Sequence, residues 1–519
     1  MRLAAQLATS LLAAGLLLAP PALRAQGDCG PVTAVQPPVD PDTFQLVQLF
    51  GIPSPRHQGR YHTGEDWYGG RGTSYGQPVR AIAAGRVTYS APAGWGRDGG
   101  VVIIEHTLPD GSVLYSQYGH MQDASGYPFP PRYSCVRMGD IIGGVGDARP
   151  APHLHFEIRV NQPDVPGPGY TWTDPVALGW RPPSAALTNW AAWLHPAHRW
   201  HLELAAPAAT SPAVLDDNSL VYLDAGRARR ATPDGRVLWR LNLDREAVGV
   251  AARAGIPVII YADGSLQAVG LDGAPVERWS LNEPLRAVFE ADGQRLAQTT
   301  AGALISLSAD LQSVVWRLEG LPPITRLVAA PGAIGALAAD NTLLTLSPAG
   351  RLLDRAQLRE PGALAAAPDG TLLAYTRGGL WRVDSAGVWA LVLADQAPPG
   401  GAGTAALQDS QGRLILYGVT GVPALRAYNQ DGALLWATPV PLMPGAVALA
   451  QHGPLLLLAS GGDLVVARAA DGALCGQIRL HGDPRAPVWS RLGSDGILRL
   501  VAGAQIAAYD WAALSQGCG

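Results

Sequence analysis

Short apolar stretches separated by glycine-rich turns fill the chain from about residue 44 to residue 160. Strands are expected at 78–83, 85–90, 101–106 and 113–117, and the Pro-Asp-Gly sequence within 108–111 is typical of a hairpin turn. No long segment of this part shows the periodicity of an amphipathic helix. The pattern therefore predicts a domain made mostly of antiparallel β-sheet.

A second pattern repeats at intervals of about 40 residues through the C-terminal part of the chain. Each copy is a turn, usually containing glycine, followed by an apolar strand that often carries a tryptophan. The turns lie at 234–235, 272–273, 310–311, 349–350, 386–387, 431–432 and 471–472. Four short strands per copy predict a β-propeller, with an irregular array of β-sandwiches as the alternative.

An eighth copy, at 497–511, lacks its outermost strand, and the segment 200–205 is expected to supply it. Eight blades are therefore favoured, and seven remain possible. The repeat resembles quinoprotein-type (PQQ-like) and WD-like propellers in period and pattern. Nothing in its turns indicates a quinone cofactor, so we expect a binding platform for an unknown ligand or protein.

The N-terminus has the pattern of an export signal. Arg2 is followed by an apolar run at 11–19, two prolines and a small residue, Ala25, at the expected cleavage site. A retained membrane anchor is the alternative, but the run is shorter than the ~20 residues that a span needs, and no later segment is long and apolar enough. We predict an exported protein, without separating periplasm, cell wall and cell exterior.

Size and composition agree with a two-domain exported protein. The 519 residues are too many for one core, and a net charge of -4 makes nucleic acid an unlikely partner. Four cysteines in an oxidising compartment suggest disulfides, most simply Cys29–Cys135 and Cys475–Cys518, although two other pairings and free thiols stay open. The predicted segments are a signal peptide (1–25), a leader (26–43), a first β-sheet domain (44–180), a linker (181–205) and the propeller (206–519).

Three short motifs in the first domain carry the candidate chemistry. His62 and Asp66 are four residues apart, His120 follows the hairpin, and His153 and His155 alternate along a predicted strand. Alternate residues of a strand share a face, so the two histidines point the same way while Leu154 and Phe156 enter the core. Two histidines and one carboxylate, with one position left for water, are typical of catalytic zinc.

Together these motifs resemble the lysostaphin/LytM-type zinc endopeptidases, which have the duplicated hybrid motif fold. The resemblance spans about 44–165 and includes Gly64, the stretches 78–87, 94–96 and 139–143, and the Pro-His-x-His-Phe sequence at 152–156. It implies that His62, Asp66 and His155 hold Zn²⁺ and that His120 and His153 are the catalytic pair, with their individual roles open. Two departures are Glu65 and the loop 147–151, which lacks the usual Thr-Gly-rich sequence, so substrate preference is in doubt more than the metal site.

The resulting hypothesis is an exported zinc metalloendopeptidase that hydrolyses peptide bonds, in peptidoglycan crosslinks or in another peptide. The alternatives are a non-catalytic wall-binding or regulatory protein and a propeller that is itself an enzyme or cofactor domain.

Several residues are expected to lie outside the chemistry. His57 and His106 are predicted at the surface or in turns, and Glu65 is predicted to face solvent. Trp95 and Tyr118 are equally suited to lining a groove or to packing. A metal at His195, His198 and His201 would be adventitious, since Pro196 interrupts any helix there.

Overall fold

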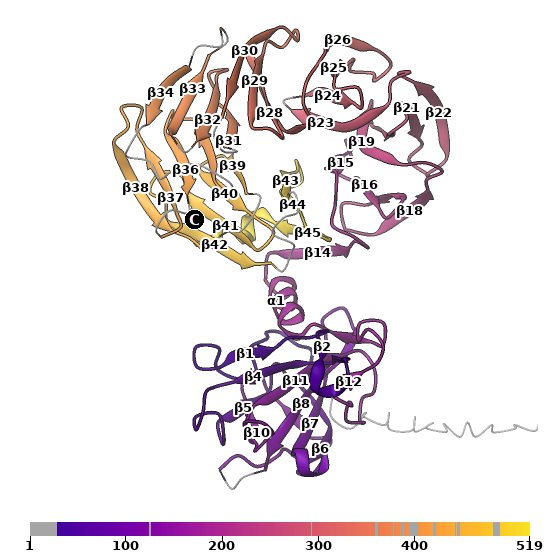
Figure 1. The fold of residues 1–519 in the computed structure, drawn as a ribbon, viewed down its shortest axis with the longest axis vertical. Coiled ribbons are helices and arrows are strands. Elements are labelled where there is room, and N and C mark those ends of the chain that lie inside the picture. Colours follow the sequence, from indigo (N-terminus) through magenta and orange to yellow (C-terminus); the bar gives the residue numbers. More distant parts are fainter. Residues whose placement is uncertain are drawn as a thin grey trace, which may run out of the picture. The chain divides into compact units, whose positions relative to one another are not determined.

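The computed structural model describes residues 29–123, 126–291, 293–358, 362–376, 378–384, 386, 389–393, 403–418, 422–441, 443, 447–480 and 488–518. The predicted signal peptide lies outside the described residues. The chain divides into two compact units, Met1–Leu187 and Thr188–Gly519, and the boundary falls inside the helix α1 (Pro183–Trp193) (Figure 1). No helix in the described part is long and apolar enough to cross a membrane.

The first unit is built from antiparallel strands, as predicted. Its ten-stranded sheet contains β1 (Gln45–Gln48), β4 (Glu65–Tyr68), β5 (Pro78–Arg80), β6 (Gly85–Ala91), β7 (Gly100–Thr107), β8 (Val113–Gln122), β9 (Cys135–Val136), β10 (Ile141–Val145), β11 (Leu154–Arg159) and β13 (Trp180–Arg181). A three-stranded sheet contains β2 (Pro53–Ser54), β3 (Arg60–His62) and β12 (Tyr170–Thr171), and two short 3-10 helices are η1 (Pro55–His57) and η2 (Gly96–Asp98). Strands β7 and β8 form the predicted hairpin.

Strand β11 lies inside the larger sheet, between β4 and β8, and every one of its residues is buried. Leu154, Phe156 and Ile158 enter the apolar core, as the alternating pattern predicts. The opposite face carries His155, Glu157 and Arg159. This strand therefore packs against the core on one face and presents buried polar side chains on the other.

His106 is not a surface residue, contrary to the prediction, but is buried between β6, β7 and β8 with an exposed fraction of 1%. Its Nδ1 donates to the carbonyl oxygen of Ala84 at 2.8 Å, and its Nε2 lies 2.7 Å from the Ser116 hydroxyl. Burial lowers the pKa of His106 to about 4, and the hydrogen bond to Ala84 opposes this only in part.

Acidification is therefore expected to destabilise the first unit through His106. An unfolded histidine has a pKa of about 6.5, so the unfolded state takes up this proton first and stability falls as the pH drops from about 6.5 towards 4. The loss at pH 4 is on the order of 3 kcal/mol. Chemical denaturation of the wild type and of His106→Gln at pH 7 and pH 4 measures it. An equal pH dependence in the two proteins would contradict the assignment.

The second unit is a β-propeller, as predicted. Its described residues form eight four-stranded antiparallel sheets, drawn as blades around a ring in Figure 1, which confirms the preference for eight blades over seven. Seven blades use consecutive strands: β15–β18 (213–242), β19–β22 (247–280), β23–β26 (285–318), β27–β30 (324–357), β31–β34 (363–393), β35–β38 (405–439) and β39–β42 (448–479).

Repeated tryptophans dock several of the blades onto the next one. In three blades the indole of the fourth strand packs over the turn between the third and fourth strands of the following blade, and its Nε1 donates to a backbone carbonyl there. These bonds are Trp279 to Leu311 at 2.8 Å, Trp316 to Pro348 at 3.0 Å and Trp436 to Ala469 at 3.2 Å. The contact explains why the turns and tryptophans recur together in the sequence.

The eighth blade is closed by a strand from the other end of the domain. Strand β14 (His198–Glu203) pairs with β45 (Gln505–Asp510), which continues to β44 (Ile497–Ala502) and β43 (Val488–Leu492). This is the closure predicted from the missing outer strand. Trp200 of β14 repeats the docking contact, since its Nε1 donates to the carbonyl of Pro233 at 2.7 Å and a Cβ added to Gly235 would lie 2.6 Å from its ring.

The segment 181–205, predicted as a linker, contains the helix α1 and the propeller strand β14. The disulfides Cys29–Cys135 and Cys475–Cys518 are both present, one in each unit, which confirms the simplest pairing.

Candidate metal centre and cleft

Strand pairing brings the three predicted ligands together. In the pairing of β4 with β11, Asp66 lies directly opposite His155. His62 ends β3 in the smaller sheet, where Tyr170 of β12 is its partner. Gly64 joins the two sheets, and a Cβ there would lie 2.7 Å from Nε2 of His155, which explains the glycine between the two ligands of the first motif.

The ligand atoms converge on one point. Nε2 of His62 lies 3.0 Å from Nδ1 of His155, which lies 2.9 Å from Oδ1 of Asp66, and the His62–Asp66 separation is 3.2 Å. Ligands about 2.0–2.1 Å from one tetrahedral zinc are about 3.3 Å from one another, so the three atoms fit one face of such a site. They are the only group of three or more metal-ligating side chains within reach of one ion in the described ranges.

The other ring nitrogens fix which atoms face the metal position. Nδ1 of His62 lies 3.2 Å from the carbonyl oxygen of Leu49, to which it donates, so Nε2 keeps its lone pair. Nε2 of His155 lies 3.0 Å from Oε1 of Glu157, so Nδ1 is the coordinating atom. Such partners set the tautomer of a metal-binding histidine.

The electrostatics of the site favour a cation at its centre. Burial would lower the pKa of His155, but hydrogen bonds to Asp66 and Glu157 outweigh burial and raise it to about 9. Burial would raise the pKa of Asp66, but its close contacts with the imidazole rings of His155 and His62 hold it well below its ordinary value. The two buried carboxylates thus surround a positive charge, and a metal ion can replace the proton that supplies it.

Glu157 is itself held by three further groups. Thr63 donates to its Oε1 at 2.6 Å, Trp180 donates to Oε2 at 2.8 Å, and Arg159 lies 3.6 Å from Oε2. Because Thr63, Trp180 and Arg159 hold the Glu157 carboxylate in place, its contact with Nε2 of His155 fixes the orientation of the His155 ring.

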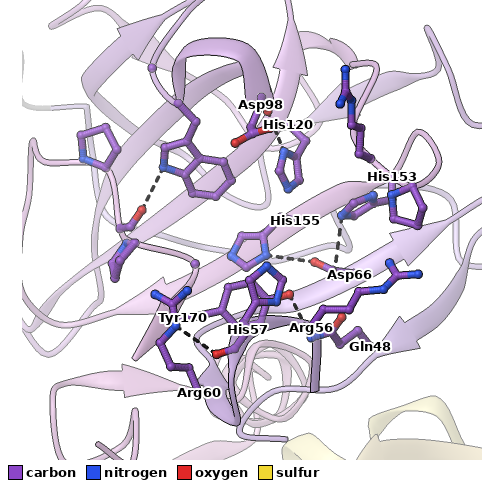
Figure 2. A pocket seen from close by; sticks show the side chains of 18 of the residues that line it. Gln48, Arg56, His57, Arg60, Asp66, Asp98, His120, His153, His155 and Tyr170 are labelled. Carbon is purple, nitrogen blue, oxygen red and sulfur yellow. Dashed lines mark hydrogen bonds and ion pairs between the residues drawn. The ribbon is translucent and has the colours of Figure 1, made fainter. Parts of the chain in front are cut away.

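His120 and His153 lie beside the ligands and face the same cavity. Their ring centroids are 4.7 Å apart, and Nε2 of His153 is 3.6 Å from Oδ2 of Asp66 (Figure 2). His120 follows Gly119 at a register shift between β7 and β8 and has a φ of 55°, in the left-handed region. The bulge turns its side chain towards the cavity.

The metal centre opens into a cleft of about 770 Å³. Trp95 and Tyr170 form part of its walls, with His120, His153 and His155 between them. The indole of Trp95 donates to the carbonyl of Gly167 at 2.9 Å, which fixes this wall. A second hollow of about 240 Å³ shares Asp66 and His153 with the first, so the space continues past the metal centre.

One further prediction about a single residue near this site is wrong, and another needs an addition. His57 lies half-exposed in the short turn η1, as predicted, but it also lines the cleft and stacks on Tyr170 with 3.6 Å between ring centroids. Glu65 does not face solvent: it is buried and accepts hydrogen bonds from the backbone N and the hydroxyl of Ser184, the latter at 2.6 Å. Glu65 therefore binds the first turn of α1 and has no place in the chemistry.

Trp95 and Tyr118, each of which could have lined a groove or packed in the core, have different positions in the structure. Trp95 lines the cleft, whereas Tyr118 is fully buried and packs against Phe156.

In the second unit, Nδ1 of His201 lies 3.3 Å from Nε2 of His198, and His201 stacks on Trp193.

Sequence reasoning did not assign roles to Glu157, Thr63, Trp180 or Asp98, whose carbonyl oxygen lies 2.6 Å from Nδ1 of His120. For Glu157 a signal existed, because it follows His155 by two residues on the same strand face. Thr63 also lies inside the first motif. Trp180 and Asp98 come from distant segments and carry no local signal.

Comparison with known proteins agrees with the geometry. Residues 60–166 match the sequence profile of peptidase family M23, and this span contains all three ligands and both further histidines. Residues 60–166 of the first unit are thus similar to peptidase family M23, the family to which the LytM-type resemblance pointed, and the second unit is a β-propeller. No curated protein matches the chain.

Three solved structures are similar over the remainder of the chain. They are BamB from Moraxella catarrhalis (15% identity, TM-score 0.44, covering 60% of this chain and 99% of that chain), the computationally designed Ika8 protein (15%, 0.45, 61% and 98%) and Sqt1 from Saccharomyces cerevisiae (10%, 0.46, 60% and 99%). The propeller assignment itself rests on the strand pairing described above.

Proposed function

We propose that the protein is an exported zinc metalloendopeptidase that cleaves peptide bonds in peptidoglycan crosslinks. The observation that carries this proposal is the convergence of His62, Asp66 and His155 within 3.2 Å, with His120 and His153 facing the same cleft. A regulatory relative would be expected to lack part of this five-residue set, so the complete set favours an enzyme.

His62, Asp66 and His155 would hold the zinc ion. When bound, zinc polarises a carbonyl group and brings the pKa of a coordinated water to about 7. The burial of the three ligands and the support of Glu157 suit a site that is pre-organised for the ion.

His120 and His153 are suited to moving protons. Hydrolysis adds water across the amide, so one proton must leave the water and one must reach the leaving nitrogen. Nδ1 of His120 donates to the carbonyl of Asp98 at 2.6 Å, and Nδ1 of His153 donates to the carbonyl of Ala151 at 2.8 Å. Each ring therefore keeps the lone pair of Nε2, and each can accept and return a proton there.

His120 is neutral near pH 7 in this environment. Burial, together with the neighbouring His153 and His155, lowers the pKa of His120 to about 4. A neutral imidazole fixed by a backbone carbonyl is ready to accept a proton or to hydrogen-bond a developing oxyanion once protonated.

The compartment and the target are inferred together. Two disulfides suit an oxidising environment, and the N-terminal sequence predicts export. The resemblance to lysostaphin/LytM-type enzymes directs the proposal to the cell wall. The propeller offers no comparable cluster of ligating side chains among its described residues, so we assign it to binding a wall polymer or a partner.

Incubation of the zinc-loaded protein with purified cell wall is expected to release new amino groups, one for each bond cleaved. Mass analysis of the soluble fragments then identifies the bond. His120→Ala serves as the matched control, because it should bind zinc and release nothing. Full zinc occupancy without release of amines from any wall preparation would overturn the proposal.

A further inference from the structure

Three arginines border the cleft, and the chemistry described so far uses none of them. Arg56 and Arg60 come from the η1–β3 segment, and Arg149 comes from the loop before His153. The sequence contains no lysine, so these guanidinium groups are the cationic side chains of the cleft apart from its histidines. The loop of Arg149 is the one that departs from the lysostaphin/LytM pattern.

The three arginines differ from other arginines of the same unit in their partners. Arg86 pairs with Glu105 at 2.9 Å and Arg132 pairs with Asp164 at 3.1 Å. Within the described residues, no carboxylate lies within ion-pair distance of the three cleft arginines. Their charge is therefore not neutralised by the protein itself.

The cleft has little acid to oppose them. Its two carboxylates are Asp66 and Asp98, and Asp66 is committed to the metal centre through His62 and His155. The cleft is thus basic although the whole chain has a net charge of -4.

The arginines are placed at separate points along the cleft. The guanidinium of Arg60 is held by the carbonyl of His57 at 3.1 Å and lies 5.8 Å from the centroid of the Trp172 ring. Arg56 borders both the main cleft and the smaller hollow that continues beyond Asp66 and His153. In Figure 2 the Arg56 side chain lies to the right of His57 and the Arg60 side chain lies to its left.

From this arrangement we propose that the cleft selects peptides that carry free carboxylate groups close to the scissile bond. Arginine presents a planar pair of donors that matches a carboxylate, and each such charge-assisted pair is stronger than a neutral hydrogen bond. Arg56 and Arg149 would contact the substrate on the His153 side of the metal centre, and Arg60 would contact it on the His57 side. The inference rests on the proposed function and specifies its substrate as an anionic peptide.

The test compares one polymer in two charge states. Purified cell-wall sacculi are used as isolated or after their free carboxyl groups have been converted to primary amides, which leaves the peptide bonds in place. We measure both the rate of amine release by the zinc-loaded protein and the amount of His120→Ala protein that co-sediments with the sacculi. The second readout needs no turnover.

The wild type is expected to cleave native sacculi at least 10-fold faster than amidated sacculi, because one charge-assisted pair contributes a factor of roughly 10. The variant Arg56→Gln/Arg60→Gln/Arg149→Gln should lose this preference and should act equally on both polymers. On the His120→Ala background, the same three substitutions should reduce co-sedimentation with native sacculi only. Arg137→Gln, an exposed arginine outside the cleft, should behave as the wild type.

Equal cleavage of native and amidated sacculi by the wild type would overturn the inference while leaving the proposed function intact. Retention of the preference by the triple variant would also overturn it, because another surface, for example on the propeller, would then recognise the carboxylates of the polymer. Absence of any cleavage contradicts the proposed function, whereas the co-sedimentation difference still decides whether the arginines bind carboxylates. Thermal melts of the variants are expected to match that of the wild type, which separates these effects from a loss of fold.

Discussion

His155→Ala is expected to lose stoichiometric zinc, whereas His120→Ala is expected to keep zinc and lose turnover. His155 supplies one of three converging atoms, and its removal leaves Asp66 and His62 without a third ligand on a buried site. Two ligands do not form the closed face that zinc requires from the protein. His120 contacts the cleft but donates its Nδ1 to a backbone carbonyl, so its removal leaves the ligand triangle intact.

Metal analysis after dialysis against a weak chelator measures the first effect, and amine release from cell wall measures the second. His57→Ala is the matched control, since His57 lines the cleft without contacting the ligand triangle and should keep zinc. Equal zinc loss in His155→Ala and His120→Ala would contradict the separate roles of the two histidines. Turnover by His120→Ala at the wild-type rate would remove this residue from the chemistry.

Trp200→Ala is expected to destabilise the propeller by about 3–5 kcal/mol, the range measured for large-to-small substitutions of buried aromatic residues. Trp200 is 9% exposed, packs over Gly235 and donates to Pro233, and it belongs to the strand that closes the ring. Its loss weakens the docking of the last blade onto the first blade, at the closure where strand pairing holds β14 to β45.

Denaturant titration of the full chain measures the change, and the transition that zinc does not shift reports on the propeller. Trp316→Ala removes the same contact between two blades that are adjacent in sequence, so it should produce a comparable local loss. Trp200→Phe keeps most of the packing and loses one hydrogen bond, at a cost of about 1 kcal/mol. If Trp200→Ala changed the free energy of unfolding by less than about 1 kcal/mol, the docking of Trp200 would not contribute to closing the propeller ring.

The periodic parts of this molecule could be predicted from the sequence, because each element carries its own signal. Strand alternation placed His153 and His155 on one face, and the repeated turn-plus-tryptophan unit predicted the blades and even the missing outer strand. These features depend on residues a few positions apart, or on a pattern repeated often enough to be recognised.

Single residues whose surroundings come from distant segments could not be predicted. His106 is buried with its ring nitrogens facing the Ala84 carbonyl and the Ser116 hydroxyl. Neither residue belongs to β7, the strand that carries His106. Glu65 is buried because Ser184, 119 positions later, supplies its donors. A lone histidine or glutamate has the same local sequence whether it faces water or a neighbouring strand, so only tertiary structure separates the two cases.

The closing strand β14 also bears on how the propeller can be inherited. Most of its blade lies at 488–510, yet its outermost strand lies at 198–203, ahead of every other propeller strand in the chain. A gene segment that began at residue 206 would encode a ring with one unpaired edge and a vacant docking position at Gly235. Recombination that transfers this propeller intact to another catalytic domain must therefore break the gene upstream of His198.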